Sequence, residues 1–268
     1  MHPLRQSPVE SLGSAAVPQG SLLVNWIGQA GFLFKSAGGA TLCVDPYLSN
    51  SIEKYEGLET RRMWWPAFAL DKLQVDGVFL THDHLDHTDP ETLPLIEAYA
   101  RPRYFAPPTS AAHLRAMRVR EEAITEIAVG DDIAFADLRL RPVYARHTED
   151  SVGLLLECAG IKVYLTGDTS PCEELYALRH EGIDVLISCI NGIYNNLNVE
   201  QAVDLARELG TSLLIPMHFG VVPANTVRPE RFLRHCAHTG TPHALLAPEE
   251  HYLLRKDGGA VRCENLPL

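Results

Sequence analysis

The sequence has no apolar run long enough to cross a membrane. Its longer apolar stretches, such as Val152 to Leu156, are far shorter than the ~20 residues that a membrane-spanning helix needs. The N-terminal segment also lacks the apolar centre of a secretory signal. We therefore expect a protein that neither spans a membrane nor is secreted.

Paired cysteines and an excess of basic residues are missing as well. The six cysteines are scattered without a C-x-x-C pair, which predicts reduced thiols in a cytoplasmic protein. The 23 Lys and Arg residues are outnumbered by 34 Asp and Glu residues, which gives a net charge of −11. Because nucleic acids and anionic membranes bind basic surfaces, neither is expected as a partner.

The composition is that of a globular protein, with 46% hydrophobic and 21% charged residues in a chain of 268. This length accommodates one large domain or two small ones. Residues 1–20 contain three prolines and little periodicity, so we expect a loose N-terminal arm. No low-complexity linker divides the remainder, which predicts a single domain over residues 21–268.

The hydrophobic pattern changes along the chain from mostly strands to alternating strands and helices. The first half predicts strands at 21–27, 31–35, 41–44, 78–81 and 104–105, helices from 89 and at 110–119, and β structure over 124–146. The second half predicts a hairpin over 152–166, strands at 185–190 and 213–217, and helices from 171, at 199–209 and at 229–238. Two strand-rich halves with helices outside them predict an α/β fold, a four-layer α/β/β/α sandwich.

Three histidines and two aspartates lie within the seven residues Thr81-His82-Asp83-His84-Leu85-Asp86-His87. The segment follows a β-branched, apolar strand and precedes a helix start, and such a loop can aim several side chains at one point. The i, i+2 spacing places His82 and His84 on the same side of an extended chain. Imidazole and carboxylate donors suit Zn, Mn or Fe, so the motif predicts a divalent metal site.

Further candidate ligands lie at the ends of other predicted strands. His147 follows the strand through Tyr144, Asp168 follows the strand ending at Thr166, and His218 follows the strand ending at Met217. Taken singly, each is typical of a polar residue at a strand end, but together they complete two sets of ligands. His235 and His238, one turn apart on a predicted helix, lack a third partner and are interpreted as exposed helix surface.

On these residues the sequence resembles the metallo-β-lactamase superfamily, and within it the ascorbate-6-phosphate lactonase (UlaG-like) group. The resemblance covers nearly the whole chain from about residue 22. The segments that carry it are 25–31, Cys43-Val44-Asp45-Pro46, the His82 to His87 motif, 147–153, Thr166-Gly167-Asp168-Thr169, Asn191-Gly192 with 195–198, and Pro216-Met217-His218-Phe219-Gly220.

The resemblance implies which residues hold metal and what they do. His82, His84 and His147 would hold one ion, Asp86, His87 and His218 the other, with Asp168 between them. One or two ions are expected, of Mn or Zn, with Fe as a further option. The implied reaction is the opening of a lactone or ester in a small anionic, sugar-derived substrate. Asp86 and Asp168 are the candidate catalytic residues because a carboxylate can orient or deprotonate water.

Candidate substrate contacts come from loops near the metal motif. Arg62 and Arg146 present a planar fork that matches phosphate or carboxylate oxygens, and Arg61 is a further option beside Arg62. Tyr194, Asn195 and Asn196 follow a buried strand, as site residues on loops do. Trp64 and Trp65 either wall the pocket or pack in the core. We expect a small-molecule substrate and a homo-oligomer.

Two other functions stay open on the sequence alone. The same metal site could cleave a phosphodiester in a small nucleotide or lipid head group. Alternatively, the chain could hold metal without turnover, with its sites kept and its pocket closed.

Overall fold

The computed structural model describes residues 12–56, 61–66, 70–248 and 250–266, and the first of its two sheets has eight strands. Their order across the sheet is β14 (Ala260–Leu266), β13 (His251–Asp257), β1 (Ser21–Gly28), β2 (Gly31–Ser36), β3 (Thr41–Val44), β4 (Gly77–Phe79), β5 (Arg103–Ala106) and β6 (Ile124–Glu126). Strands β3 to β6 are parallel, and the pairs from β14 to β3 are antiparallel.

The second sheet has six strands and is also mixed. Its order is β12 (Leu213–Met217), β11 (Val185–Cys189), β10 (Ile161–Leu165), β9 (Val152–Cys158), β8 (Leu138–Tyr144) and β7 (Ile133–Phe135). Strands β10, β11 and β12 are parallel to one another, whereas β9 is antiparallel to both of its neighbours. The ends of β8, β10 and β12 therefore point the same way.

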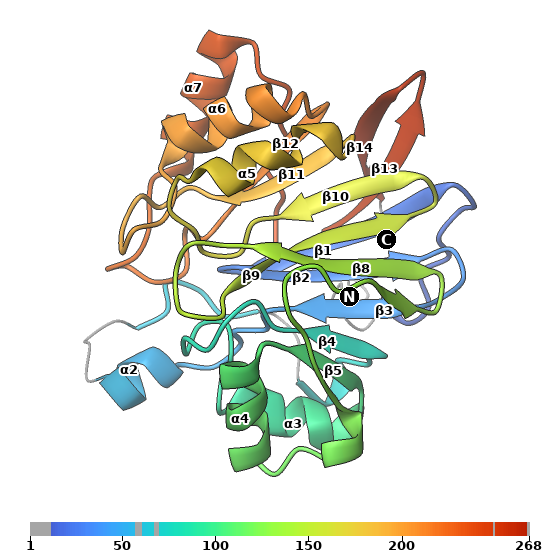
Figure 1. Cartoon of the computed structure of the whole chain (residues 1–268), viewed down its shortest axis with the longest axis vertical. Helices are drawn as coiled ribbons and strands as arrows, with labels where there is room; N and C mark the ends of the chain where they lie inside the picture. The colour runs from blue at the N-terminus through green and yellow to red at the C-terminus, as the bar shows by residue number, and fades with distance from the viewer. Residues whose placement is uncertain (1–11, 57–60, 67–69, 249, 267–268) are drawn as a thin grey trace, which may run out of the picture.

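Helices lie outside the two sheets on both sides, as Figure 1 shows. On the side of the first sheet are α2 (Ser51–Glu56), α3 (Thr92–Tyr99) and α4 (Pro108–Ala116), with the 3₁₀ turns η1 (Leu70–Lys72) and η2 (Glu121–Ala123). On the other side are α5 (Glu173–Ala177), α6 (Val199–Leu209) and α7 (Pro229–Thr239), with η3 (Leu178–His180). The four-layer α/β/β/α prediction is confirmed.

Strand β1 shows why this sequence forms layers. All eight of its residues are buried, because both faces of the sheet are covered. Leu22 and Val24 join the cluster between the two sheets, whereas Leu23 and Ile27 join the cluster under α3 and α4. Alternate residues of a strand point to opposite faces, so a continuous apolar run serves two cores at once.

The described part of the predicted N-terminal arm, residues 12–20, is mostly exposed, but its first residue is anchored to the domain. Leu12 is 1% exposed and belongs to the cluster on the outer face of the first sheet. The Lys35 ammonium donates hydrogen bonds to the carbonyl oxygens of Leu12 and Gly13, at 2.7 and 2.9 Å. Apolar burial and a cation at backbone oxygens hold this stretch against the domain. Residues 1–11 lie outside the described part of the chain.

The hairpin of β13 and β14 was not predicted from the sequence. Its turn is Gly258-Gly259, both with positive φ, and the two strands flank it with a regular antiparallel register. Such a Gly-Gly pair between apolar-polar alternations is a hairpin signal. Its first strand, β13, pairs with β1, so the first and the last strand of the described chain belong to one sheet. In the described residues, no helix is long and apolar enough to cross a membrane.

Candidate metal centre

The metal motif forms a tight loop between β4 and α3. The backbone N–H groups of His87 and Thr88 both donate to the carbonyl oxygen of His84, which closes the turn. The Thr88 hydroxyl donates to the carbonyl oxygen of His82 at 2.6 Å. These bonds hold the loop in one conformation, so the histidine side chains start from defined positions.

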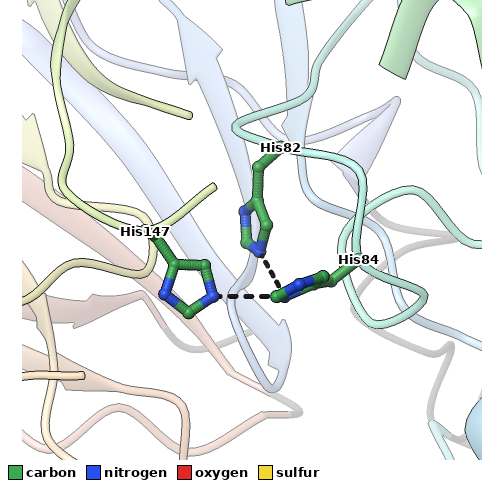
Figure 2. Close-up of side chains that lie close together, drawn as sticks. All are labelled: His82, His84 and His147. Atoms are coloured by element: carbon green, nitrogen blue, oxygen red, sulfur yellow. Dashed lines mark hydrogen bonds between the residues drawn. The ribbon is translucent and has the colours of Figure 1, made fainter. Parts of the chain in front are cut away.

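Three imidazoles converge on one point, as Figure 2 shows. The Nδ1 atom of His84 lies 3.1 Å from Nε2 of His82 and 3.1 Å from Nε2 of His147. Burial, with the neighbouring His87 adding to it, holds the pKa of His82 well below its ordinary value, and burial also lowers the pKa of His147. His82 and His147 are therefore neutral near pH 7, the state in which a histidine binds metal.

A second group of donors lies beside the first. Nε2 of His218 is 3.3 Å from Oδ2 of Asp86 and 3.2 Å from Oδ2 of Asp168. Asp168 also reaches the first group, because the same Oδ2 lies 3.8 Å from Nε2 of His147. Its other oxygen, Oδ1, is 3.6 Å from Nε2 of His87. Asp168 thus lies between the two groups, in the arrangement that the resemblance implied.

The strand ends explain how residues so distant in sequence meet. Asp168 follows β10 and His218 follows β12, at the carboxyl ends of parallel strands. His147 follows β8, which runs in the same direction as β10. The histidine loop follows β4 of the opposite sheet. One edge of the sandwich therefore collects donors from four loops.

Two buried donor atoms that lack hydrogen-bond partners indicate that this site fits a divalent metal. Among the described residues, Nε2 of His87 and Oδ1 of Asp168 are buried without a hydrogen-bond partner. Leaving such polar atoms unpaired in a protein interior costs free energy. A cation between them would satisfy both. Donor atoms lie within 4.8 Å of one another in each of three groups: His82, His84 and His147; His82, His87 and Asp168; and Asp86, His87 and His218.

Without metal, the second group holds protons. Burial lowers the pKa of His218, but the Asp168 and Asp86 carboxylates outweigh it and raise that pKa to about 9. Burial likewise opposes the charged form of His87, and Asp168 outweighs it, so that pKa also lies well above its ordinary value. In turn, the histidines hold the pKa values of Asp86 and Asp168 below the ordinary range despite burial.

Metal binding is expected to strengthen as pH rises towards about 9, where His218 loses its proton in the metal-free protein. Below that pH the metal must displace the proton, and each displaced proton changes the affinity roughly tenfold per pH unit. Titrating metal-free protein with Mn²⁺ at pH 7 and at pH 8 measures the affinity at each pH. A pH-indicator dye in unbuffered solution measures the protons that are released. Equal affinities at the two pH values would contradict the protonated state of His218.

Two supporting residues were not predicted from the sequence as part of the site. The carboxylate of Asp45, directly after β3, accepts from the backbone N–H and the hydroxyl of Thr81 and from Nδ1 of His87 at 2.7 Å. Gln29, in the turn between β1 and β2, donates from Nε2 to Oδ2 of Asp86 at 2.9 Å. Both are fully buried and orient groups that face the centre. Both lie in segments that carry the family resemblance, 25–31 and 43–46, but the residues alone offered only a polar side chain at the end of an apolar strand.

A cleft opens beside the metal centre, with a volume of about 410 Å³. This size is in the range of small-molecule sites, roughly 300–1,000 Å³. It is lined by Ile52, His84, Asp86, His147, Asp168, Tyr194, Asn195, Val222, Ala224 and Asn225. Tyr194 and Asn195, both predicted as substrate contacts, thus lie at the cleft.

Asn196 takes a different position from the one predicted. It is 5% exposed, and its Nδ2 donates to Oδ2 of Asp168 at 2.7 Å. The backbone explains the difference, because Tyr194 and Asn195 both have positive φ and turn the chain inward before Asn196. Asn196 therefore orients the carboxylate between the two donor groups and does not line the cleft.

The prediction that Arg62 and Arg146 bind substrate is not supported, because neither lines the cleft. Arg62 is 6% exposed, and its guanidinium donates to the carbonyl oxygens of Tyr47, Ser49 and Trp64. Arg146 is half exposed and lies 3.8 Å from Glu174. Arg146 precedes His147 in the sequence, which predicted a position near the centre. In the structure its side chain points towards Glu174 of α5 instead.

Trp64 and Trp65 also differ in exposure. Trp64 is half-buried and does not line the cleft; it packs edge-on against Trp26, with ring centroids 6.1 Å apart, and against the cluster that contains Ile52 and Val222. Trp65 is 56% exposed and does not line the cleft. Arg61 is also exposed, with its Nε 3.7 Å from a carboxylate oxygen of Glu53.

Replacing Arg62 with alanine is expected to lower the free energy of unfolding by about 3 kcal/mol, since three carbonyl oxygens lose their donor and a cavity opens. Urea unfolding measures this change. The matched control is Arg61→Ala, whose side chain is 89% exposed and should change stability by less than ~0.5 kcal/mol. Unchanged stability of Arg62→Ala with weaker binding of anionic substrates alone would restore the substrate-binding role.

The sequence matches the beta-lactamase superfamily domain over residues 41–219, about two thirds of the chain, a span that contains all seven donors. It is 28% identical over 210 residues to a UPF0173 protein of Pyrococcus furiosus, covering 77% of this chain and 87% of that one. A UPF0173 metal-dependent hydrolase of Anaeromyxobacter sp. strain K is 26% identical over 232 residues, covering 79% and 80%. Igni18, a metallo hydrolase of Ignicoccus hospitalis, has a similar fold, with a TM-score of 0.73 at 18% identity, covering 88% and 100%.

Proposed function

The chain belongs to the beta-lactamase superfamily, and from the geometry of its metal centre we propose that it is a metal-dependent hydrolase that opens a lactone or an ester. One observation carries the proposal: imidazole and carboxylate donors from four loops converge beside a cleft of small-molecule size. The name of the Anaeromyxobacter relative, a metal-dependent hydrolase, agrees with it. The resemblance to ascorbate-6-phosphate lactonases supports a lactone as the compound whose ring is opened.

The donor set accommodates one or two ions. Zn, Mn and Fe all accept imidazole and carboxylate ligands, and such an ion would supply an acidified water and polarise a carbonyl. Asp86 and Asp168 line the cleft as well as the metal centre, so they are the groups that can orient water or accept its proton. Gln29 donates one hydrogen bond to Asp86 and Asn196 donates one to Asp168, and these bonds hold the two carboxylates in place.

The experiment combines metal analysis of the purified protein with a hydrolysis screen. Lactones, esters and phosphodiesters are offered to protein treated with a chelator and then reloaded with Mn²⁺ or Zn²⁺. We expect turnover of a lactone or ester that disappears with the chelator and returns with metal. Turnover of phosphodiesters alone would replace the proposal with a phosphodiesterase. Bound metal without any turnover would identify a non-catalytic metal-binding protein.

A further inference from the structure

Among the described residues, neither lysine nor arginine lines the cleft beside the metal centre, and its two histidines, His84 and His147, belong to the metal centre. All of the 23 Lys and Arg residues except Arg5 lie in the described part of the chain, so nearly the full set of cations has a known position. None of those described lines the cleft. An anionic group held away from the metal centre would therefore find no charge partner there.

The wall away from the metal is apolar on one side. Ile52 comes from α2, and Val222 and Ala224 come from the loop after β12. Ile52 and Val222 are both buried and pack in one small cluster with Tyr47 and Val221. The wall is therefore backed by packed side chains, and apolar substrate surface placed against it would leave water.

Neutral hydrogen-bonding groups complete the cleft. Asn225 accepts through Oδ1 from Nδ2 of Asn191 at 2.6 Å, which leaves the donor half of its amide for a ligand. Asn195 and Tyr194 line the same space. These groups recognise carbonyl and hydroxyl oxygens, and none of them compensates a buried charge.

We propose that the substrate is an uncharged acyl compound whose portion away from the reacting carbonyl is at least partly apolar and rests against Ile52, Val222 and Ala224. This inference rests on the proposed hydrolase function and specifies its substrate class, with an uncharged compound in place of the anionic, sugar-derived one that the resemblance implied. Asp86 and Asp168 belong to the metal centre, where a bound cation would offset their charge, but the cleft away from it offers an anion neither Lys nor Arg, and the whole chain carries a net charge of −11. An anionic tail would be both desolvated and repelled, whereas an alkyl tail would gain by burial.

A matched pair of substrates tests the inference on metal-loaded protein. One is a lactone with a short alkyl tail, and the other has a carboxylate at the end of the same tail. We expect kcat/KM to favour the uncharged lactone at least tenfold. Binding of the matching cyclic ketones, which lack the scissile C–O bond, should show the same preference without any turnover.

The variant Ala224→Arg places a cation on the apolar wall. Ala224 is exposed, so the change should leave folding intact. We expect the preference for the uncharged lactone and ketone to fall at least tenfold. The matched control is Ala112→Arg, which makes the same change in charge at an exposed position of α4 that does not line the cleft, and it should retain the wild-type preference.

The outcomes separate the two proposals. A wild-type preference for the anionic lactone and ketone would overturn the uncharged substrate and leave the hydrolase standing. An unchanged preference in Ala224→Arg would likewise overturn it, since the substrate would then not rest on this wall. If metal-loaded protein binds the uncharged ketone but hydrolyses neither lactone, the hydrolase proposal fails while the preference of the cleft is upheld.

Discussion

Replacing His84 with alanine is expected to weaken metal binding at least ~100-fold and to abolish hydrolysis, with the fold retained. Loss of a group that merely orients a ligand already costs about 10–100-fold in affinity, so loss of a ligand should cost more. The Nδ1 atom of His84 lies 3.1 Å from Nε2 of His82 and 3.1 Å from Nε2 of His147, so it is central to its group. Because His84 is exposed, its removal leaves little cavity in the core.

Three measurements on one preparation check this expectation. Metal content after dialysis reports affinity, a lactone or ester assay reports turnover, and thermal unfolding of the metal-free protein reports the fold. His238→Ala is the matched control, because it removes an exposed histidine from α7 that lies in none of the donor groups. Full turnover by metal-free wild-type protein would refute the requirement for metal.

The metal centre was predictable because histidines and aspartates gathered in one short segment have few purely structural roles. Three histidines and two aspartates after an apolar strand have few structural explanations, and strand ends collect at one edge of a parallel sheet. The same reasoning reached Asp168 and His218, which the structure places within 3.2 Å of each other. Donor chemistry and position at a strand end made these residues candidates, and the family resemblance assigned them to the metal centre.

Substrate contacts were harder to predict because arginine has many structural uses. Adjacency to His147 in the sequence suggested that Arg146 lies near the centre, but its exposed side chain lies beside the carboxylate of Glu174. Arg62 is buried because three backbone oxygens needed a donor. Such needs arise only from the packed fold and leave no pattern in the local sequence.

Fold prediction succeeded for segments with a strong period and failed where packing comes from distant residues. The predicted strand at Thr41–Val44 and helix at Val199–Leu209 have the observed bounds. The stretch after Leu12 has no period of its own, and its order depends on Lys35 and the outer face of the first sheet. Likewise, the β13–β14 hairpin finds its place only by pairing with β1, more than 200 residues away.

Replacing Asp86 with asparagine is expected to lower kcat at least ~100-fold with the metal still bound at saturating concentration. Asparagine keeps the size and one oxygen donor of aspartate, so Gln29 can still donate its hydrogen bond. The lost charge is the feature that allows a carboxylate to accept a proton from water, and general-base catalysis contributes about 10²–10⁴-fold. Asp86 lines both the second donor group and the cleft, where such a proton transfer would occur.

Asp83→Asn is the matched control, since it removes the same charge from the same loop at a residue that joins none of the donor groups. Its kcat should stay within about twofold of wild type. Steady-state kinetics at saturating metal, with metal content measured on the same samples, separates loss of proton transfer from loss of the ion. An unchanged kcat with a raised KM in Asp86→Asn would show that this carboxylate only binds substrate or metal, and the proton would then have to pass to Asp168.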